Sequence, residues 1–165
     1  MNRRMQGLLL AALHLAVVGS LGAKLLYDRA TRPRVWVRTA PRDPVLPIRG
    51  RYVSLLLEVQ TERPLGDTQR VTLRVENNQL IADPVSDRFS AGAVPVYVRN
   101  LRGGSVTTLD PPVAYFIPEH VPDPSARPAG EELWAEVTVP KNGPPRPIRL
   151  GVKKGDGAIT PLELK

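Results

Sequence analysis

The sequence predicts a mainly β protein, in which an N-terminal transmembrane helix precedes one small antiparallel β-sandwich or barrel-like domain. Three observations favour this class. Residues 7–23 form an apolar segment without a charged side chain. Short stretches of alternating apolar and polar residues follow, a pattern typical of half-buried strands. Eighteen prolines and thirteen glycines among 165 residues favour many short segments joined by turns over long helices.

Residues 1–29 are interpreted as a membrane anchor. Leu25, Leu26 and Tyr27 extend the apolar segment past Lys24, giving roughly 20 residues, about the minimum that crosses a bilayer as a helix. A cleaved signal peptide shares these features, but an Ala-x-Ala exit is missing, so we favour a retained anchor. His14 is either a functional polar group in the membrane or a tolerated neutral imidazole, and we favour the second.

The charges that flank the apolar segment conflict with export. Lysine and arginine are more numerous after the segment than before it, which places the C-terminal domain in the cytoplasm by the positive-inside rule. An N-terminal anchor usually exports the domain that follows, and we expect a single-pass inner-membrane protein with a periplasmic domain. The cations counted are Arg3 and Arg4 before the segment, and Lys24, Arg29, Arg32, Arg34 and Arg38 after it.

Composition narrows the classes of partner and chemistry. The formal net charge is +7, and seven arginines fall within residues 29–51, so anionic surfaces are the expected partners. Their position beside the anchor favours anionic lipid headgroups, contacted by Arg29, Arg32 and Arg34. Nucleic acid is not expected as a partner, because few aromatic residues accompany these arginines. The absence of cysteine excludes disulfides, thiolate metal sites and cysteine nucleophiles.

Residues 30–165 are expected to form the β-rich soluble domain. Residues 34–38 alternate, with Val35 and Val37 on one face, and the low aromatic content requires a core of aliphatic side chains. Asn77-Asn78 and Asn142-Gly143 indicate hairpin turns. Residues 83–90 are interpreted as polar with one helical turn. Further strands are predicted over residues 52–60, 70–76, 80–81, 93–101, 106–109, 113–117, 131–139 and 148–152.

The stretch of residues 49–57 is expected to form the entry corner of this domain. A proline-rich approach ends at Gly50, which allows a backbone turn that other residues make at higher cost. Tyr52 offers an apolar ring with a polar tip, and an apolar run then enters the core.

Residues 50–57 resemble the motif of the GDYXXLXY family of bacterial membrane-anchored proteins. Gly50, Tyr52 and Leu55 match it, whereas Arg51 replaces the aspartate and Leu57 the second tyrosine. Residues 115–119 (Tyr-Phe-Ile-Pro-Glu) are similar to the family's Tyr-Phe-Val-Pro-Glu signature, and the resemblance covers the chain from the anchor to the C-terminal hairpin. It implies an anchored extracytoplasmic domain, commonly encoded beside polytopic membrane proteins. It supplies no catalytic residues to carry over.

Two functional classes follow from these patterns. We expect a non-enzymatic accessory or binding module for a membrane partner, possessing no catalytic residue, metal or cofactor. The alternative is an envelope enzyme of hydrolase type that uses Glu119 and His120 as acid and base. A metal site that adds Asp43 to these two residues has no supporting spacing. The expected binding surface consists of Gly50, Arg51, Tyr52, Leu55, Tyr115, Phe116, Pro118 and Glu119.

Overall fold

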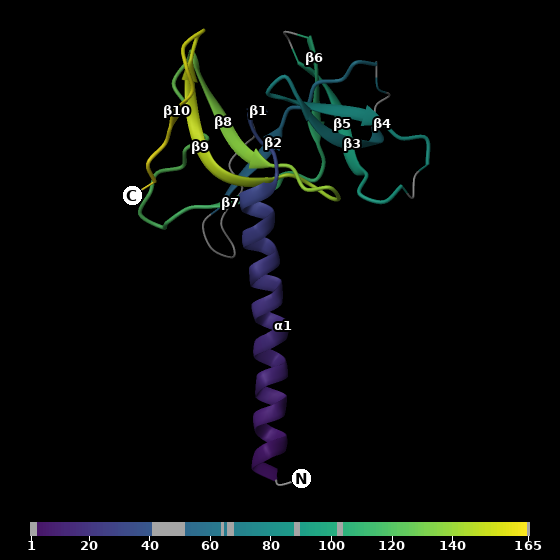
Figure 1. Cartoon of the computed structure of the whole chain (residues 1–165). Helices are drawn as coiled ribbons and strands as arrows, with labels where there is room; N and C mark the ends of the chain where they lie inside the picture. The colour runs from purple at the N-terminus through teal and green to yellow at the C-terminus, as the bar shows by residue number, and fades with distance from the viewer. Residues whose placement is uncertain are drawn as a thin grey trace. The chain divides into compact units, whose positions relative to one another are not determined.

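The computed structural model describes residues 3–40, 52–63, 65, 68–87, 90–101 and 104–164. One long helix, apolar in composition, precedes antiparallel sheets, so the predicted mainly β fold class is confirmed. Figure 1 shows the helix and the strands. The chain divides into two compact units, residues 1–32 and residues 33–165. The elements are α1 (Arg3–Thr31), β1 (Arg34–Ala40), β2 (Tyr52–Leu57), β3 (Thr68–Glu76), β4 (Gln79–Pro84), β5 (Val94–Leu101), β6 (Gly104–Leu109), β7 (Val113–Phe116), β8 (Glu131–Thr138), β9 (Arg146–Lys154) and β10 (Thr160–Pro161).

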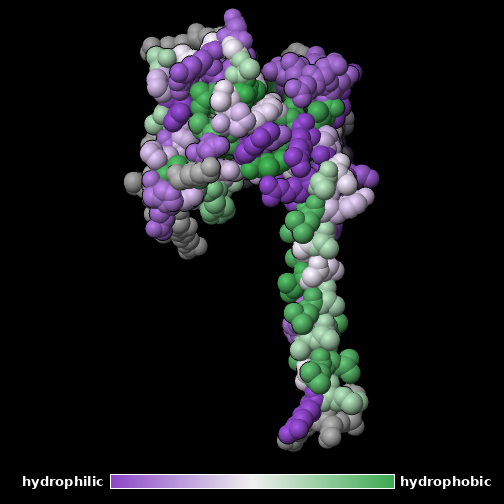
Figure 2. Space-filling view, turned by 60° about the vertical axis from the view of Figure 1, so that its left-hand side comes forward, coloured by the Kyte–Doolittle hydropathy of each residue, from purple (hydrophilic) through white to green (hydrophobic). Residues whose placement is uncertain are grey.

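α1 contains the apolar N-terminal segment. Leucine and alanine, both strong helix formers, dominate it, and its 29 residues give a length of about 44 Å. Its apolar side chains are exposed, and Figure 2 shows them along the helix. The helix is long and apolar enough to cross a membrane, as an anchor or as a signal sequence. It ends at Thr31 because the residue before Pro33 is disfavoured in helical conformation.

Two polar side chains of the first unit are satisfied within it. His14 Nδ1 lies 2.8 Å from the carbonyl oxygen of Leu10, one turn earlier. Near the end of the helix, Arg32 Nη2 lies 3.0 Å from Asp28 Oδ1. The contact with the Leu10 carbonyl supports the simpler interpretation of His14, in which the helix itself satisfies the imidazole.

The larger sheet has six strands in the order β10-β9-β8-β1-β2-β7, and its described pairs are antiparallel. β1 shows the predicted alternation. Val35 and Val37 are buried, whereas Arg34, Trp36 and Arg38 lie on the opposite face. This face is therefore polar and aromatic, and the inner face belongs to the core.

The smaller sheet has four strands in the order β4-β3-β5-β6. Asn77 and Asn78 connect β3 to β4 with φ angles of 48° and 60°, which confirms the predicted hairpin, since asparagine tolerates positive φ well. The helical turn expected over residues 83–90 is wrong for the described residues 83–87 and 90. Asp83 and Pro84 instead complete β4, opposite β3, and Pro84 is tolerated because β4 is an edge strand of this sheet.

The continuation of β2 past Leu57 joins the two sheets. The N–H of Val59 donates to the carbonyl of Thr107 in β6 at 2.9 Å. The N–H of Gln60 donates to Leu80 in β4, also at 2.9 Å. The N–H of Glu58 still donates to the carbonyl of Arg38 in β1 at 2.9 Å, so residues 58–60 are held by the six-stranded sheet at one end and reach both edges of the four-stranded sheet. The consecutive leucines of β2 are all buried, as expected for a strand covered on both faces.

One continuous core fills the interior of the second unit. Among the described residues, its fully buried members are aliphatic, as the low aromatic content predicts, and they come from both sheets. They include Val35, Leu55, Leu57, Val71, Val96, Ala135, Val137 and Leu150.

Candidate functional site

β2 and β7 bring together the two segments that carry the expected binding surface. Tyr52 pairs with Phe116, and Leu55 pairs with Val113, in one antiparallel ladder. About sixty residues of chain separate the two segments, so only the fold makes them neighbours. Gly50 and Arg51, the other two positions of that surface on the first segment, lie outside the described residues.

The outer face of this strand pair carries an aromatic contact. The ring centroids of Tyr52 and Phe116 lie 6.1 Å apart, with the ring planes inclined at 56°, a geometry favourable to aromatic pairs. The side chain of Phe116 is 72% exposed, whereas Tyr52 is partly buried. Among described large hydrophobic residues outside α1, only Phe116 and Tyr97 are exposed. An exposed aromatic ring braced by a second ring is a suitable anchor for a partner surface.

The inner face of the same strands belongs to the core. Leu55 is 1% exposed, so its side chain is unavailable to a partner. Tyr115 packs against the core, and its hydroxyl lies 3.4 Å from the carbonyl oxygen of Ile148 in β9. The alternation of side chains along a strand therefore divides the expected surface into an outer half and a structural half.

β7 is the last strand of the six-stranded sheet. Within the described part of the chain, its strand partner is β2 alone. The strand is four residues long, and Pro112 and Pro118 stand close to its two ends, which restricts how far this edge extends. Short, proline-bounded edges limit uncontrolled pairing with other chains. The exposed ring of Phe116 is thus presented on a confined edge.

The segment after β7 forms a turn at the surface. The N–H of Val121 donates to the carbonyl of Pro118 at 3.2 Å, and Pro118, Glu119 and His120 are all exposed. Glu119 and His120, the two residues of the hydrolase alternative, therefore stand next to each other at the surface. Among the described residues, no group of three or more His, Asp or Glu side chains could hold a metal ion.

A cluster around Arg38 was not anticipated from the sequence. Arg38 Nη2 lies 2.8 Å from Glu132 Oε1, and its Nε lies 3.8 Å from Glu58 Oε1. Burial raises the pKa of Glu58; Arg38 opposes this shift and the nearby Glu132 adds to it. Only strand register brings these three side chains together, and sequence periodicity does not reveal register.

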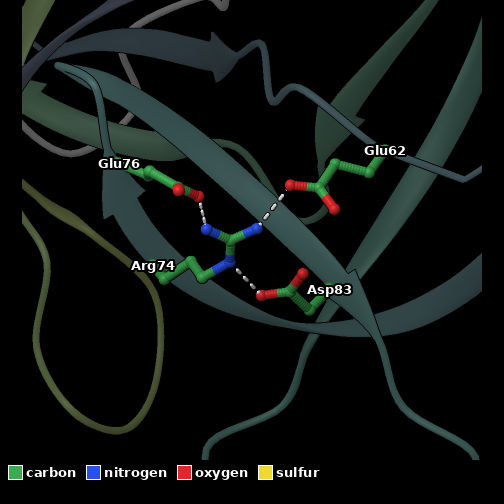
Figure 3. A network of polar contacts seen from close by, with 4 residues as sticks. All are labelled: Glu62, Arg74, Glu76 and Asp83. Atoms are coloured by element: carbon green, nitrogen blue, oxygen red, sulfur yellow. Dashed lines mark hydrogen bonds and ion pairs between the residues drawn. The ribbon is translucent and has the colours of Figure 1, made fainter.

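A second unanticipated network ties a loop to the β3–β4 hairpin (Figure 3). Arg74 Nε donates to Asp83 Oδ2 at 2.7 Å, its Nη2 donates to Glu62 Oε1 at 2.6 Å, and its Nη1 is paired with Glu76. These hydrogen bonds, that to Asp83 foremost, raise the pKa of Arg74. Since these side chains are well exposed, their ion pairs add little to the stability of the domain, and their main effect is to hold the loop of Glu62 against the hairpin.

In comparisons with protein-family models, curated proteins and solved structures, nothing matches this chain.

Proposed function

We propose that this protein is an accessory module held at the inner membrane by α1, whose β domain docks on a polytopic membrane protein encoded nearby. The observation that carries this proposal is the exposed Phe116 ring, braced by Tyr52 on a short edge strand. Exposed aromatic anchors of this kind supply a large share of the binding energy at protein interfaces. Within the proposal, the chain belongs to the GDYXXLXY family, and Tyr52 and Phe116 form the aromatic pair that joins its two motif segments.

The short connection between helix and domain supports a partner in the membrane. Two residues, Arg32 and Pro33, separate the end of α1 from the start of β1. Two residues span at most about 7 Å when extended, so the connection between the anchor and the domain is short. An anchored domain meets a partner in the same bilayer at a high effective concentration.

In this proposal α1 remains uncut, and the β domain lies on the periplasmic side. Arg29, Arg32 and Arg34 then stand where the chain leaves the bilayer, and we propose that they contact anionic lipid headgroups. Asp28, which pairs with Arg32, reduces the net charge of this group.

Co-purification with the polytopic membrane proteins encoded beside this chain tests the docking proposal. Full-length chains are co-expressed with each candidate in turn, and the bound fraction is compared between the parent chain, Phe116→Ala and Tyr97→Ala. Tyr97, 45% exposed on β5 of the other sheet, is the matched aromatic control. We expect Phe116→Ala to reduce binding by about ten-fold or more and Tyr97→Ala to leave it unchanged. Equal retention by all three chains contradicts the assigned surface.

A further inference from the structure

A groove of about 570 Å³ opens on the polar face of the six-stranded sheet. Side chains of β1, β8 and β9 line one part of it, and the β3–β4 turn with the continuation of β2 lines the other. It is separate from the Tyr52–Phe116 surface, and none of those residues lines it.

The charges of the groove balance. Arg38 and Lys153 contribute two cations, and Glu58 and Glu132 contribute two carboxylates. Arg38 is already paired with Glu132 at 2.8 Å. A groove without excess charge does not concentrate polyanions or polycations, so it favours a neutral polar ligand.

Four amide side chains stand at the groove without a hydrogen bond to the described part of the chain. They are exposed, and each offers both donors and an acceptor. The four are Gln60, Asn77, Asn78 and Gln79. This composition suits a ligand whose groups also both donate and accept, as hydroxyl groups do.

The two tryptophans of the groove are held in place by their neighbours. The guanidinium of Arg149 lies 5.3 Å from the Trp36 ring centroid, and Lys153 Nζ lies 5.5 Å from that of Trp134. The indole N–H of Trp134 donates to Glu132 at 3.2 Å. Pre-organised aromatic walls beside polar groups match a ligand with an apolar body and a polar rim.

The topology opposes an extended peptide as the ligand. Peptides in extended conformation bind chiefly by adding a strand to a free sheet edge. β1 is paired with β2 and β8, and β8 is paired with β1 and β9. The edge of β4 at the groove is occupied by Gln60, whose N–H donates to Leu80 and whose carbonyl accepts from Ala82. Recognition here relies on side chains.

We infer that this groove binds a neutral glycan, whose pyranose rings pack against Trp36 and Trp134 while its hydroxyl groups bond to the surrounding amides. Sugar rings combine a C–H surface with a rim of hydroxyls, which is the pattern that the lining presents. This inference does not depend on the docking proposal, because it uses different residues and a different face.

Tryptophan emission provides the test, because the chain contains two tryptophans and both line the groove. Full-length protein in nanodiscs, free of sugar-based detergent, is titrated with tetramers of β-1,4-linked N-acetylglucosamine and with maltotetraose. We expect a saturable change with at least one of the two. The double variant Gln60→Ala/Gln79→Ala is expected to weaken binding by about ten-fold or more. Gln69→Ala, an exposed glutamine on β3 outside the groove, is the matched control and is expected to bind as the parent does.

Three results overturn the inference. The first is that neither tetramer changes the tryptophan emission at millimolar concentration. The second is that the double variant binds as tightly as the Gln69→Ala control. The third is a saturable response to a neutral extended peptide that neither glycan produces. Because co-purification with a membrane partner is measured separately, failure here leaves the docking proposal standing.

Discussion

Tyr52 and Phe116 face each other across the β2–β7 ladder with ring centroids 6.1 Å apart, one ring partly buried and the other largely exposed. Three residues further along β2, Leu55 points the opposite way and is 1% exposed. A single strand pair therefore contributes to the core on one face and presents an aromatic ring on the other.

Stability measurements separate these two faces. Leu55→Ala is expected to lower the free energy of unfolding by about 2–5 kcal/mol, because it leaves a cavity in the core. Phe116→Ala is expected to cost no more than about 1 kcal/mol, because most of its ring is already in solvent. Denaturant unfolding followed by tryptophan emission measures both. A larger loss for Phe116→Ala than for Leu55→Ala would contradict the assignment of faces.

Gly151 of β9 is expected to resist substitution by alanine. A Cβ atom there would lie 2.8 Å from Ile159 Cγ2 and 2.9 Å from Trp36 Cζ3. We expect Gly151→Ala to destabilise the domain by about 1–3 kcal/mol and to alter the emission of Trp36. A double-mutant cycle with Trp36→Leu provides the control, since removing the larger ring should reduce the cost of the added methyl. Identical costs in both backgrounds would show that the ring does not restrict this position.

Arg149 is expected to matter more to stability than its exposure suggests. Its Nε donates to Glu136 Oε2 at 2.5 Å, and Glu136 is 8% exposed. Arg149→Met leaves that carboxylate without its cation, and we expect a loss of about 1–3 kcal/mol. Lys153→Met, which removes a neighbouring cation of the same strand, is the comparison and should cost less. Urea unfolding at neutral pH measures the free energy of unfolding of both variants, and an equal loss in the two would contradict the role given to Arg149.

Glu58 is expected to give the domain a pH dependence of definite sign. Its folded-state pKa is raised, chiefly by burial, so folding favours the protonated carboxyl. Stability is therefore unaffected below the unfolded value, near 4.5, and falls as the pH rises from there through the higher folded pKa. Glu58→Gln should be more stable than the parent at neutral pH and should lack this fall. Glu62→Gln, which alters an exposed glutamate bonded to Arg74, should retain the fall, and unfolding curves at several pH values measure it.

The sidedness of the β domain is open to a direct measurement. Two reporter enzymes are fused after Lys165 in separate chains, one active outside the cytoplasm and one active inside. If the anchor exports the domain, only the external reporter should be active. The mass of the purified parent chain then distinguishes an uncut anchor, which we expect, from a cleaved signal peptide. Activity of the internal reporter alone would instead support the positive-inside count.

Local patterns predicted the helix, the burial of β1 and one hairpin of this fold. The uncharged residues 7–23 predict α1, the alternation of Val35 and Val37 predicts the burial of β1, and Asn77-Asn78 predicts its hairpin. The structure confirms each of these, since helix length, strand alternation and turn chemistry are properties of neighbouring residues. The helical turn over residues 83–90 failed where pairing with β3 extended β4 through Asp83 and Pro84.

What the sequence by itself determined is thus a leading apolar helix and a set of half-buried strands with an aliphatic core. The tertiary structure alone decided that Tyr52 meets Phe116, that residues 58–60 join the two sheets, and that Arg38 gathers Glu58 and Glu132. The physical reason is that strand register is set by contacts between residues far apart in the chain. A shift of one residue would turn every side chain to the other face without changing any local pattern.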